Sequence, residues 1–151
     1  MKPYRLFILL LACVSFLPAF AQTKPGDEIC GKYSVTSPNS NNTAKIEVYR
    51  AKDGTYQAKF IWTSASNPDG SPLKDVNNED PAKRNRPIIG MVTIWGLKYV
   101  DGEYVGGSIY DPVSGKVYGI KGKKAKNGKD MDVRYFWKRP ALGRDVVWKR
   151  I

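Results

Sequence analysis

Apolar and polar residues alternate along most of this chain, most regularly between Arg86 and Ile120. The sequence there is RPIIGMVTIWGLKYVDGEYVGGSIYDPVSGKVYGI, in which runs of Val, Ile, Tyr and Trp are bounded by turn dipeptides. Such residues favour strands, and Asp-Gly or Ser-Gly between two runs favours a tight turn. The stretch therefore predicts consecutive antiparallel strands joined at Asp101-Gly102 and at Asp111 to Gly115.

The same alternation continues on both sides of this stretch, and no segment shows the period of an α-helix. The further strands that it predicts are Gly31–Val35, Lys45–Ala51, Thr55–Trp62, Met131–Trp137 and Val146–Arg150. Short glycine turns, as at Asp53-Gly54 and Asn127-Gly128, join most neighbours. We therefore predict an all-β fold, an antiparallel up-and-down β-barrel of about eight strands, in preference to a two-sheet sandwich.

A barrel of this size needs an apolar interior, and aromatic residues on one face of the predicted strands supply it. The aromatic residues that we expect inside are Tyr56, Phe60, Trp62, Trp95, Tyr118 and Trp148. They either fill the barrel or line a cavity that holds one small ligand, and the pattern leaves both open.

The N-terminus has the parts of a secretory signal peptide. Lys2 and Arg5 precede an apolar run, and Ala19-Phe20-Ala21 has small residues where signal peptidase cleaves. We expect residues 1–21 to be removed and residues 22–151 to form a single exported domain, periplasmic or secreted. The alternative is a lipoprotein that is anchored to a membrane through Cys13.

The chain is strongly basic, with 25 Lys and Arg against 14 Asp and Glu and a formal charge of +11. In an exported protein this charge favours acidic glycans, lipid headgroups or anionic small molecules as partners over nucleic acid. Lys121–Lys129 and Lys83–Arg86 are candidates for an anion-binding rim. A basic surface that only confers solubility is the alternative, because the lysines are spread along the chain.

Residue types that the chain lacks exclude several chemistries. There is no histidine, which removes Ser-His and Cys-His nucleophilic sites and imidazole metal sites. After cleavage only Cys30 remains, so the domain has no intrachain disulfide, and we expect this thiol to be buried. We predict no catalytic residue, metal or cofactor. A carboxylate enzyme is a weaker alternative, because Glu47 and Asp132 fall on polar faces and Asp111 belongs to a turn.

The segment Ser64–Arg86 interrupts the alternation with prolines and scattered charges. A connection of this length without a pattern is usually either functional or mobile. Oxygen-bearing residues in Asp75–Asp80 are spaced as in a calcium loop, but the glycine expected at the sixth position and the glutamate at the twelfth are absent.

Short motifs near the centre have structural explanations. In Asp111-Pro112-Val113-Ser114-Gly115 each residue suits its turn position, and we expect the Asp111 carboxylate to cap backbone N–H groups rather than bind a ligand. Gly106-Gly107 indicates a β-bulge or a close approach of the backbone to a ligand.

Two arginines are candidate ligand anchors. A guanidinium turned inward among tyrosines offers paired donors and a permanent charge to a carboxylate or phosphate. With the aromatic residues, the candidate ligand-binding residues are Trp62, Trp95, Tyr118, Arg134 and Arg144.

Five segments from Pro87 onward are PIIGMVTIWGL, GGSIYDPVSGKVY, MDVRYF, LGR and VVWKR. They resemble a family of uncharacterised exported bacterial proteins known as domain of unknown function 2147. Gly107–Tyr118 and Leu142–Trp148 are its most specific parts, and the resemblance extends back to Gly31-Lys32-Tyr33 and the hairpin Lys45–Ile61. It implies a lipocalin-like β-barrel and brings no established activity.

The resemblance implies a set of structural positions, which are Gly31, Tyr33, Gly107, Asp111, Pro112, Gly115, Gly143, Trp148 and Arg150. Lipocalin-like barrels often close with a basic residue of the last strand over an aromatic of the first, so we expect Arg150 or Arg144 to cover Tyr33. Many relatives have a Cys-x-x-Cys pair before Pro-Ile-Ile-Gly and a glycine after Val-Arg. This chain has Asn78–Arg86 and Tyr135 there, so no redox or metal role of that pair applies.

These observations favour a monomeric, non-enzymatic barrel that binds a small or lipid-like, anionic ligand. The alternative is a cell-envelope module that binds acidic glycan, lipid headgroups or a protein through a basic rim. An interior cavity of about 300 Å³ or more is what the first hypothesis requires.

Overall fold

The computed structural model describes residues 24–37 and 40–151. The predicted signal peptide and the alternative lipid-bearing Cys13 lie outside these residues. Within them, no helix has the length and apolar character needed to cross a membrane.

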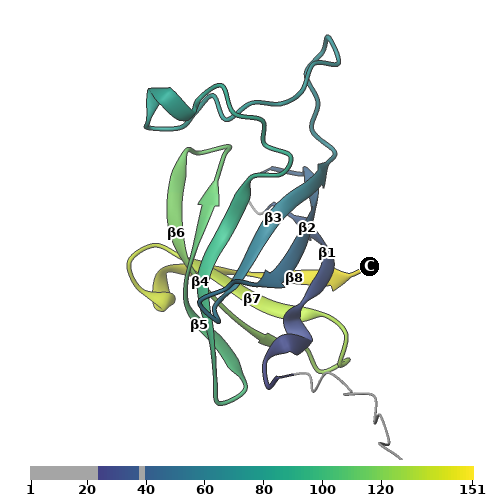
Figure 1. Ribbon diagram of the computed structural model, residues 1–151, viewed down its shortest axis with the longest axis vertical. Coiled ribbons are helices and arrows are strands. Elements are labelled where there is room, and N and C mark those ends of the chain that lie inside the picture. The colour runs from purple at the N-terminus through teal and green to yellow at the C-terminus, as the bar shows by residue number, and fades with distance from the viewer. Residues whose placement is uncertain (1–23, 38–39) are drawn as a thin grey trace, which may run out of the picture.

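Eight antiparallel strands in the described residues form a closed barrel, in which sequence neighbours pair and β8 pairs with β1 (Figure 1). The strands are β1 (Gly31–Thr36), β2 (Thr43–Arg50), β3 (Tyr56–Thr63), β4 (Val92–Val100), β5 (Glu103–Asp111), β6 (Lys116–Lys124), β7 (Met131–Phe136) and β8 (Gly143–Arg150). Short 3-10 helices are η1 (Asp27–Ile29), η2 (Pro81–Lys83) and η3 (Pro140–Leu142). The predicted up-and-down barrel is confirmed.

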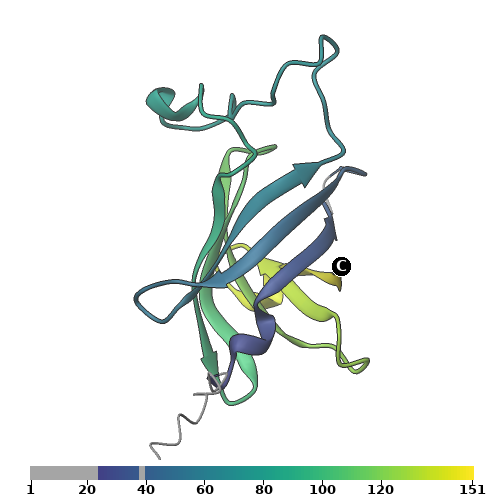
Figure 2. The same cartoon turned by 45° about the vertical axis from the view of Figure 1, so that its right-hand side comes forward.

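One end of the barrel is closed by η1. Ile29 is buried there, and its carbonyl accepts a hydrogen bond of 2.9 Å from the Tyr33 hydroxyl. The Tyr104 hydroxyl donates to the carbonyl of Gly26 at 2.7 Å. Figures 1 and 2 show η1 at the lower end of the barrel and the long β3–β4 connection at the opposite end, here called the mouth.

The half of the barrel next to η1 is filled by side chains. Its members are almost fully buried residues of the core: Ile29, Tyr33, Tyr56, Leu97, Tyr104, Ile120, Met131 and Trp148. Because this half is solid, any interior space lies toward the mouth.

A bulge in β3 corrects the prediction that Trp62 faces inward. Ile46 pairs with Phe60 but Lys45 pairs with Trp62, so Ile61 is an extra residue. An extra residue reverses the alternation of side chains that follows it. Trp62 is therefore 44% exposed on the outer wall, where the Lys45 ammonium lies 4.9 Å from its ring centroid.

The prediction for Trp95 is also wrong. Ile94 is buried in the interior, so its neighbour Trp95 points outward and is 37% exposed. Gly96 then has φ +74°, a left-handed conformation that glycine adopts without strain, and Leu97 is again buried.

The predicted structural roles of two motifs are confirmed. The pairing register shifts between Tyr104 and Gly107, which is the bulge expected at Gly106-Gly107. In the following turn the Asp111 carboxylate accepts from the Val113 N–H at 3.0 Å and from the Ser114 hydroxyl at 2.8 Å.

The barrel closes at the seam between β1 and β8. Pairing there is short, with Tyr33 opposite Arg150 and Ser34 opposite Lys149. The Arg150 guanidinium lies 4.8 Å from the centroid of the Tyr33 ring, which confirms the predicted stacking and assigns it to Arg150. Gly31 leaves room for it, because a Cβ at that position would lie 2.5 Å from Arg150 Nη1.

Candidate functional site

The half of the barrel toward the mouth contains a cavity of about 520 Å³. Every strand from β1 to β8 contributes to its wall, and four connections at the mouth form its rim. The volume lies within the range of about 300–1,000 Å³ that small-ligand pockets occupy. The space that the ligand-binding hypothesis requires is therefore present.

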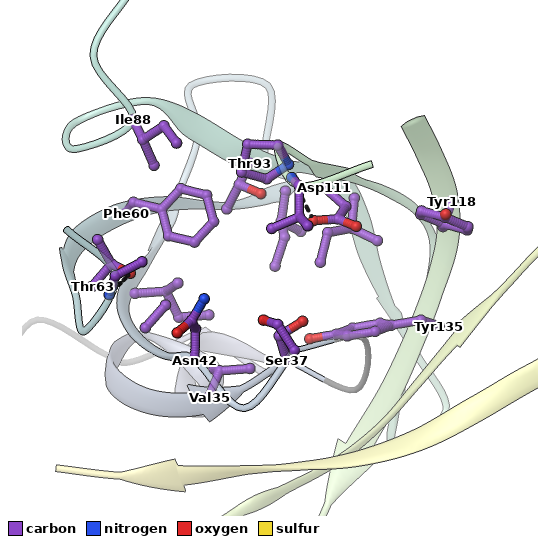
Figure 3. Close-up of a pocket in the computed structure, with 18 of the residues that line it drawn as sticks. Val35, Ser37, Asn42, Phe60, Thr63, Ile88, Thr93, Asp111, Tyr118 and Tyr135 are labelled. Atoms are coloured by element: carbon purple, nitrogen blue, oxygen red, sulfur yellow. Dashed lines mark hydrogen bonds between the residues drawn. The ribbon is translucent and has the colours of Figure 1, made fainter. Parts of the chain in front are cut away.

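The wall of this cavity is mainly apolar. Its apolar side chains include Val35, Ala44, Ile46, Phe60, Ile94 and Ile109. Figure 3 shows Phe60 and Ile88 on one side of the space and Tyr118 and Tyr135 on the other. Ile46 and Ile94 also belong to the packed core, so they form the boundary between the solid and the hollow halves.

Tyr135 is the polar residue that the sequence analysis did not propose. Its ring lines the cavity, and its hydroxyl oxygen accepts a hydrogen bond of 2.8 Å from Trp148 Nε1. Burial raises the pKa of the Tyr135 phenol above its usual value, so the hydroxyl stays protonated. Its alternation with Met131 and Val133, which are buried, was the signal that could have found it.

The two candidate arginines lie on different sides of the wall. Arg144 lines the cavity directly opposite Tyr135 in the β7–β8 register. Arg134 points outward, where it forms an ion pair of 2.7 Å with Asp145 and donates to the Pro140 carbonyl at 2.6 Å. Arg144 therefore borders the cavity with an exposed side chain, and its role as a ligand anchor stays a prediction. The prediction of an inward anchor is wrong for Arg134, which holds the β7–β8 connection.

Of the remaining candidates, only Tyr118 reaches the cavity. It lines the wall and packs against Trp137, with 5.8 Å between the ring centroids. Trp62 and Trp95 lie on the outer wall, as described above.

The acids considered for a carboxylate enzyme are not brought together. Glu47 forms an ion pair of 3.0 Å with Lys59 on the outer wall, and Asp132 is exposed. Asp111 lines the cavity, but both of its carboxylate oxygens accept hydrogen bonds within the turn.

The long connection between β3 and β4 is organised around Asp75, which is fully buried. Its carboxylate accepts hydrogen bonds from Asn78 Nδ2 at 2.8 Å and from Arg86 Nε at 2.9 Å. The residues of this connection that line the cavity are Ala65, Leu73, Lys74, Val76, Asn77 and Ile88. The connection therefore builds one side of the rim.

The two basic groups do not form one rim. Lys83–Arg86 belong to the mouth, where Lys83 pairs with Asp80 at 3.2 Å and Arg86 with Asp75 at 2.8 Å. Lys121–Lys129 surround the β6–β7 hairpin at the closed end, where Lys124 pairs with Glu28 at 2.6 Å. The charge is thus divided between opposite ends of the barrel.

Cys30 is half-buried against the core rather than fully buried as expected. Desolvation raises the pKa of its thiol above the ordinary value, which lowers the fraction of reactive thiolate.

A solved structure with a similar fold is that of protein HP1028 from the human pathogen Helicobacter pylori, described as belonging to the lipocalin family. The two chains share 29% sequence identity and superpose with a TM-score of 0.69, over 81% of this chain and 82% of that one. No protein of curated function matches this chain.

A lipocalin-like barrel is therefore established by both its strand topology and its structural neighbour. Residues 25–150 match the model of the family described as "Uncharacterized protein conserved in bacteria (DUF2147)", and the chain belongs to that family.

Proposed function

We propose that this protein is a non-enzymatic binding protein that holds a small, lipid-like molecule inside its barrel. The observation that carries the proposal is the cavity of about 520 Å³ with its mainly apolar wall. Covering apolar wall with an apolar ligand contributes roughly 25 cal/mol per Å² that is removed from water. The cavity therefore favours a ligand with a substantial apolar part.

The charge of the molecule favours an anionic ligand within this class. Arg144 and Lys74 line the cavity, and the chain as a whole carries a formal charge of +11. A positive field raises the local concentration of anions near the mouth. The relationship to a protein of the lipocalin family supports ligand binding in general and does not identify the ligand.

The proposal includes export. The signal peptide expected at residues 1–21 would direct the domain, as a monomer, to the periplasm or the medium, where it would carry its ligand. The lipoprotein alternative through Cys13 would instead anchor the same barrel to a membrane.

A fluorescent apolar probe, N-phenyl-1-naphthylamine, tests the proposal by titration against the purified domain. Ala44 lines the cavity, and Ala44→Phe would fill part of it. We expect saturable fluorescence enhancement in the native domain and a loss of most of it in Ala44→Phe. The control is Val147→Phe, which places the same phenylalanine side chain at an exposed position on the outer wall. Equal enhancement in both variants would show that the probe binds elsewhere.

The envelope-module alternative rests on the basic group at the closed end. Vesicles with and without anionic lipid separate it from cavity binding, since retention through Lys121–Lys129 would fall with increasing salt. Salt-dependent retention by Ala44→Phe equal to that of the native domain would support the alternative, because the cavity would then be irrelevant to it.

A further inference from the structure

Exposed apolar side chains surround the opening of the cavity. Four of them line the cavity and yet are between 46% and 65% exposed: Val76, Val113, Trp137 and Leu142. They come from three of the connections at the mouth, and we call them the apolar rim. Exposed apolar side chains that cluster around a site, rather than occur singly, mark a surface that interacts with something apolar.

Contacts between the three connections hold the apolar rim together. Asn77, next to Val76 in the β3–β4 connection, donates from Nδ2 to the Val113 carbonyl at 2.9 Å. Val113 belongs to the β5–β6 turn, and Tyr118 on the strand that follows packs against Trp137. The rim is therefore a continuous border of the opening and not a set of unrelated loop tips.

The β7–β8 connection combines apolar and basic side chains. In Trp137–Leu142 the two apolar ends flank Lys138 and Arg139, which are both exposed. The backbone is held in place, because the Trp137 N–H donates to the Leu142 carbonyl at 3.3 Å and Arg134 donates to another carbonyl of the connection at 2.6 Å. Trp and Leu beside Lys and Arg are typical of protein segments at a membrane interface.

The cations beside the apolar rim have no acidic partner. Lys74, Lys138 and Arg139 are exposed, and none of them forms an ion pair within residues 24–37 and 40–151. The Trp137–Leu142 segment itself contains no acid. Free positive charge next to exposed apolar side chains complements a surface that is anionic outside and apolar beneath.

We propose that the mouth of the barrel docks onto an anionic phospholipid surface. The apolar rim enters the head-group layer, and Lys138 and Arg139 pair with lipid phosphates. This inference rests on the proposed function, since docking in this orientation opens the cavity directly onto lipid. It adds the surface with which the ligand is exchanged.

A lipid surface fits this end of the barrel better than the other candidates. A protein seated on the apolar rim would close the cavity, whereas fluid lipid can surround the rim and still reach the opening. The basic segment at the closed end, Lys121–Lys129, contains no large apolar side chain that could enter a membrane. Positive charge and exposed apolar side chains thus occur together at the mouth.

Co-sedimentation with phosphatidylcholine vesicles, with and without phosphatidylglycerol, tests the docking and its charge dependence. We expect binding to the anionic vesicles to be about tenfold or more stronger at low salt and to weaken as salt is added. Lys138→Gln with Arg139→Gln should weaken it about tenfold or more. The matched control, Lys123→Gln with Lys126→Gln, removes the same charge from the closed end and should bind as the native domain does.

A second pair of variants tests the apolar rim. Val113→Ser with Leu142→Ser should weaken binding to the anionic vesicles about fivefold or more, because less apolar surface enters the lipid. Both side chains are exposed, so the change leaves the core intact. The control is Val100→Ser with Ile151→Ser, which makes the same change at exposed positions of the closed end.

Tryptophan fluorescence reports which face meets the lipid. Trp62, Trp95 and Trp137 are the exposed tryptophans, and the first two lie on the outer wall. Anionic vesicles with brominated acyl chains should quench the native domain. Trp137→Phe keeps an apolar ring and still docks, but most of the quenching should be lost. Trp95→Phe should retain it.

The outcomes separate the docking from the proposed function. Absence of binding to anionic vesicles, or equal weakening by the mouth and closed-end variants, overturns the docking. Dimerisation in sedimentation equilibrium that the Val113→Ser, Leu142→Ser variant abolishes also overturns it, because a second copy then covers the apolar rim. These results leave the naphthylamine titration of the cavity unaffected. Failure of that titration overturns the proposed function, whereas the vesicle assays still decide whether the mouth meets lipid.

Discussion

The Asp75 carboxylate accepts a hydrogen bond of 2.5 Å from the hydroxyl of Tyr110, which lies on β5 and 35 residues further along the chain. Asp75 is completely buried, and the Arg86 guanidinium both pairs with it and lies 5.7 Å from the centroid of the Tyr110 ring. One carboxylate thus attaches the β3–β4 connection to the barrel wall. The position of the cavity rim depends on it.

Asp75→Asn should loosen this connection. An amide side chain at this position has no charge to pair with Arg86. Its NH2 group is also a hydrogen-bond donor, so it would face one of the donors that bind the carboxylate in the native protein. Together these losses should lower the free energy of unfolding by on the order of 1–3 kcal/mol. Hydrogen exchange of residues 72–90 should accelerate more than exchange of the strands. Asp69→Asn is the matched control, because Asp69 is exposed in the same connection and caps only Ser71. Equal exchange in both variants would contradict the role assigned to Asp75.

Arg150→Gln should destabilise the barrel at its seam. The guanidinium stacks on Tyr33 and donates to the carbonyls of Cys30 at 3.0 Å and Lys129 at 3.2 Å. Loss of these contacts should lower the free energy of unfolding in urea by about 1–3 kcal/mol. Arg150→Lys should recover only part of it, since lysine keeps the charge but not the planar fork. Lys149→Gln serves as control, and an Arg150→Gln variant as stable as this control would refute the seam contact.

Gly107→Ala should be destabilising through crowding. A Cβ at Gly107 would lie 2.6 Å from Leu97 Cγ and 3.0 Å from Ile120 Cγ2, both in the packed core. Extra volume in a well-packed core costs about 1–3 kcal/mol. The neighbouring Ser108→Ala should change stability by less than about 0.5 kcal/mol, because Ser108 faces outward opposite Trp95. Thermal unfolding of the two variants compares these effects directly, and equal midpoints would count against the crowding.

The alternation of residues was sufficient to predict the strands and turns, because each depends on neighbours in sequence. The alternation gave the wrong face of the sheet for Trp62 and Trp95. The extra residue in β3 and the left-handed Gly96 in β4 each shift the inward and outward positions by one residue. Such irregularities depend on the pairing between two strands, which the sequence of one strand does not reveal. The alternation also could not predict the hydrogen bond from Tyr110 to Asp75, since that contact joins segments that are distant in the sequence. The sequence indicated that Arg134 or Arg144 would lie at the cavity. Only the structure shows that it is Arg144, which borders the cavity opposite Tyr135 in the β7–β8 pairing.

Buried tyrosines should make the fold sensitive to alkaline pH. Burial, and then a hydrogen bond to the Asp27 carboxylate, raises the pKa of Tyr56 to about 12, and burial with a hydrogen bond to Asp75 does the same for Tyr110. In the unfolded chain tyrosine ionises near pH 10, so below about pH 10 both states are protonated and stability is unaffected.

Between about pH 10 and 12 the unfolded state releases these protons while the folded state keeps them, so stability falls as the pH rises. Groups with the same pKa in both states add nothing to this slope. Urea unfolding at about pH 9, 10 and 11 should therefore show a constant free energy of unfolding followed by a decline. Tyr56→Phe removes one of the contributing groups and should reduce the decline, although it lowers stability at pH 9 by losing the hydrogen bond to Asp27. A decline of the same steepness in this variant would show that other groups control the alkaline transition.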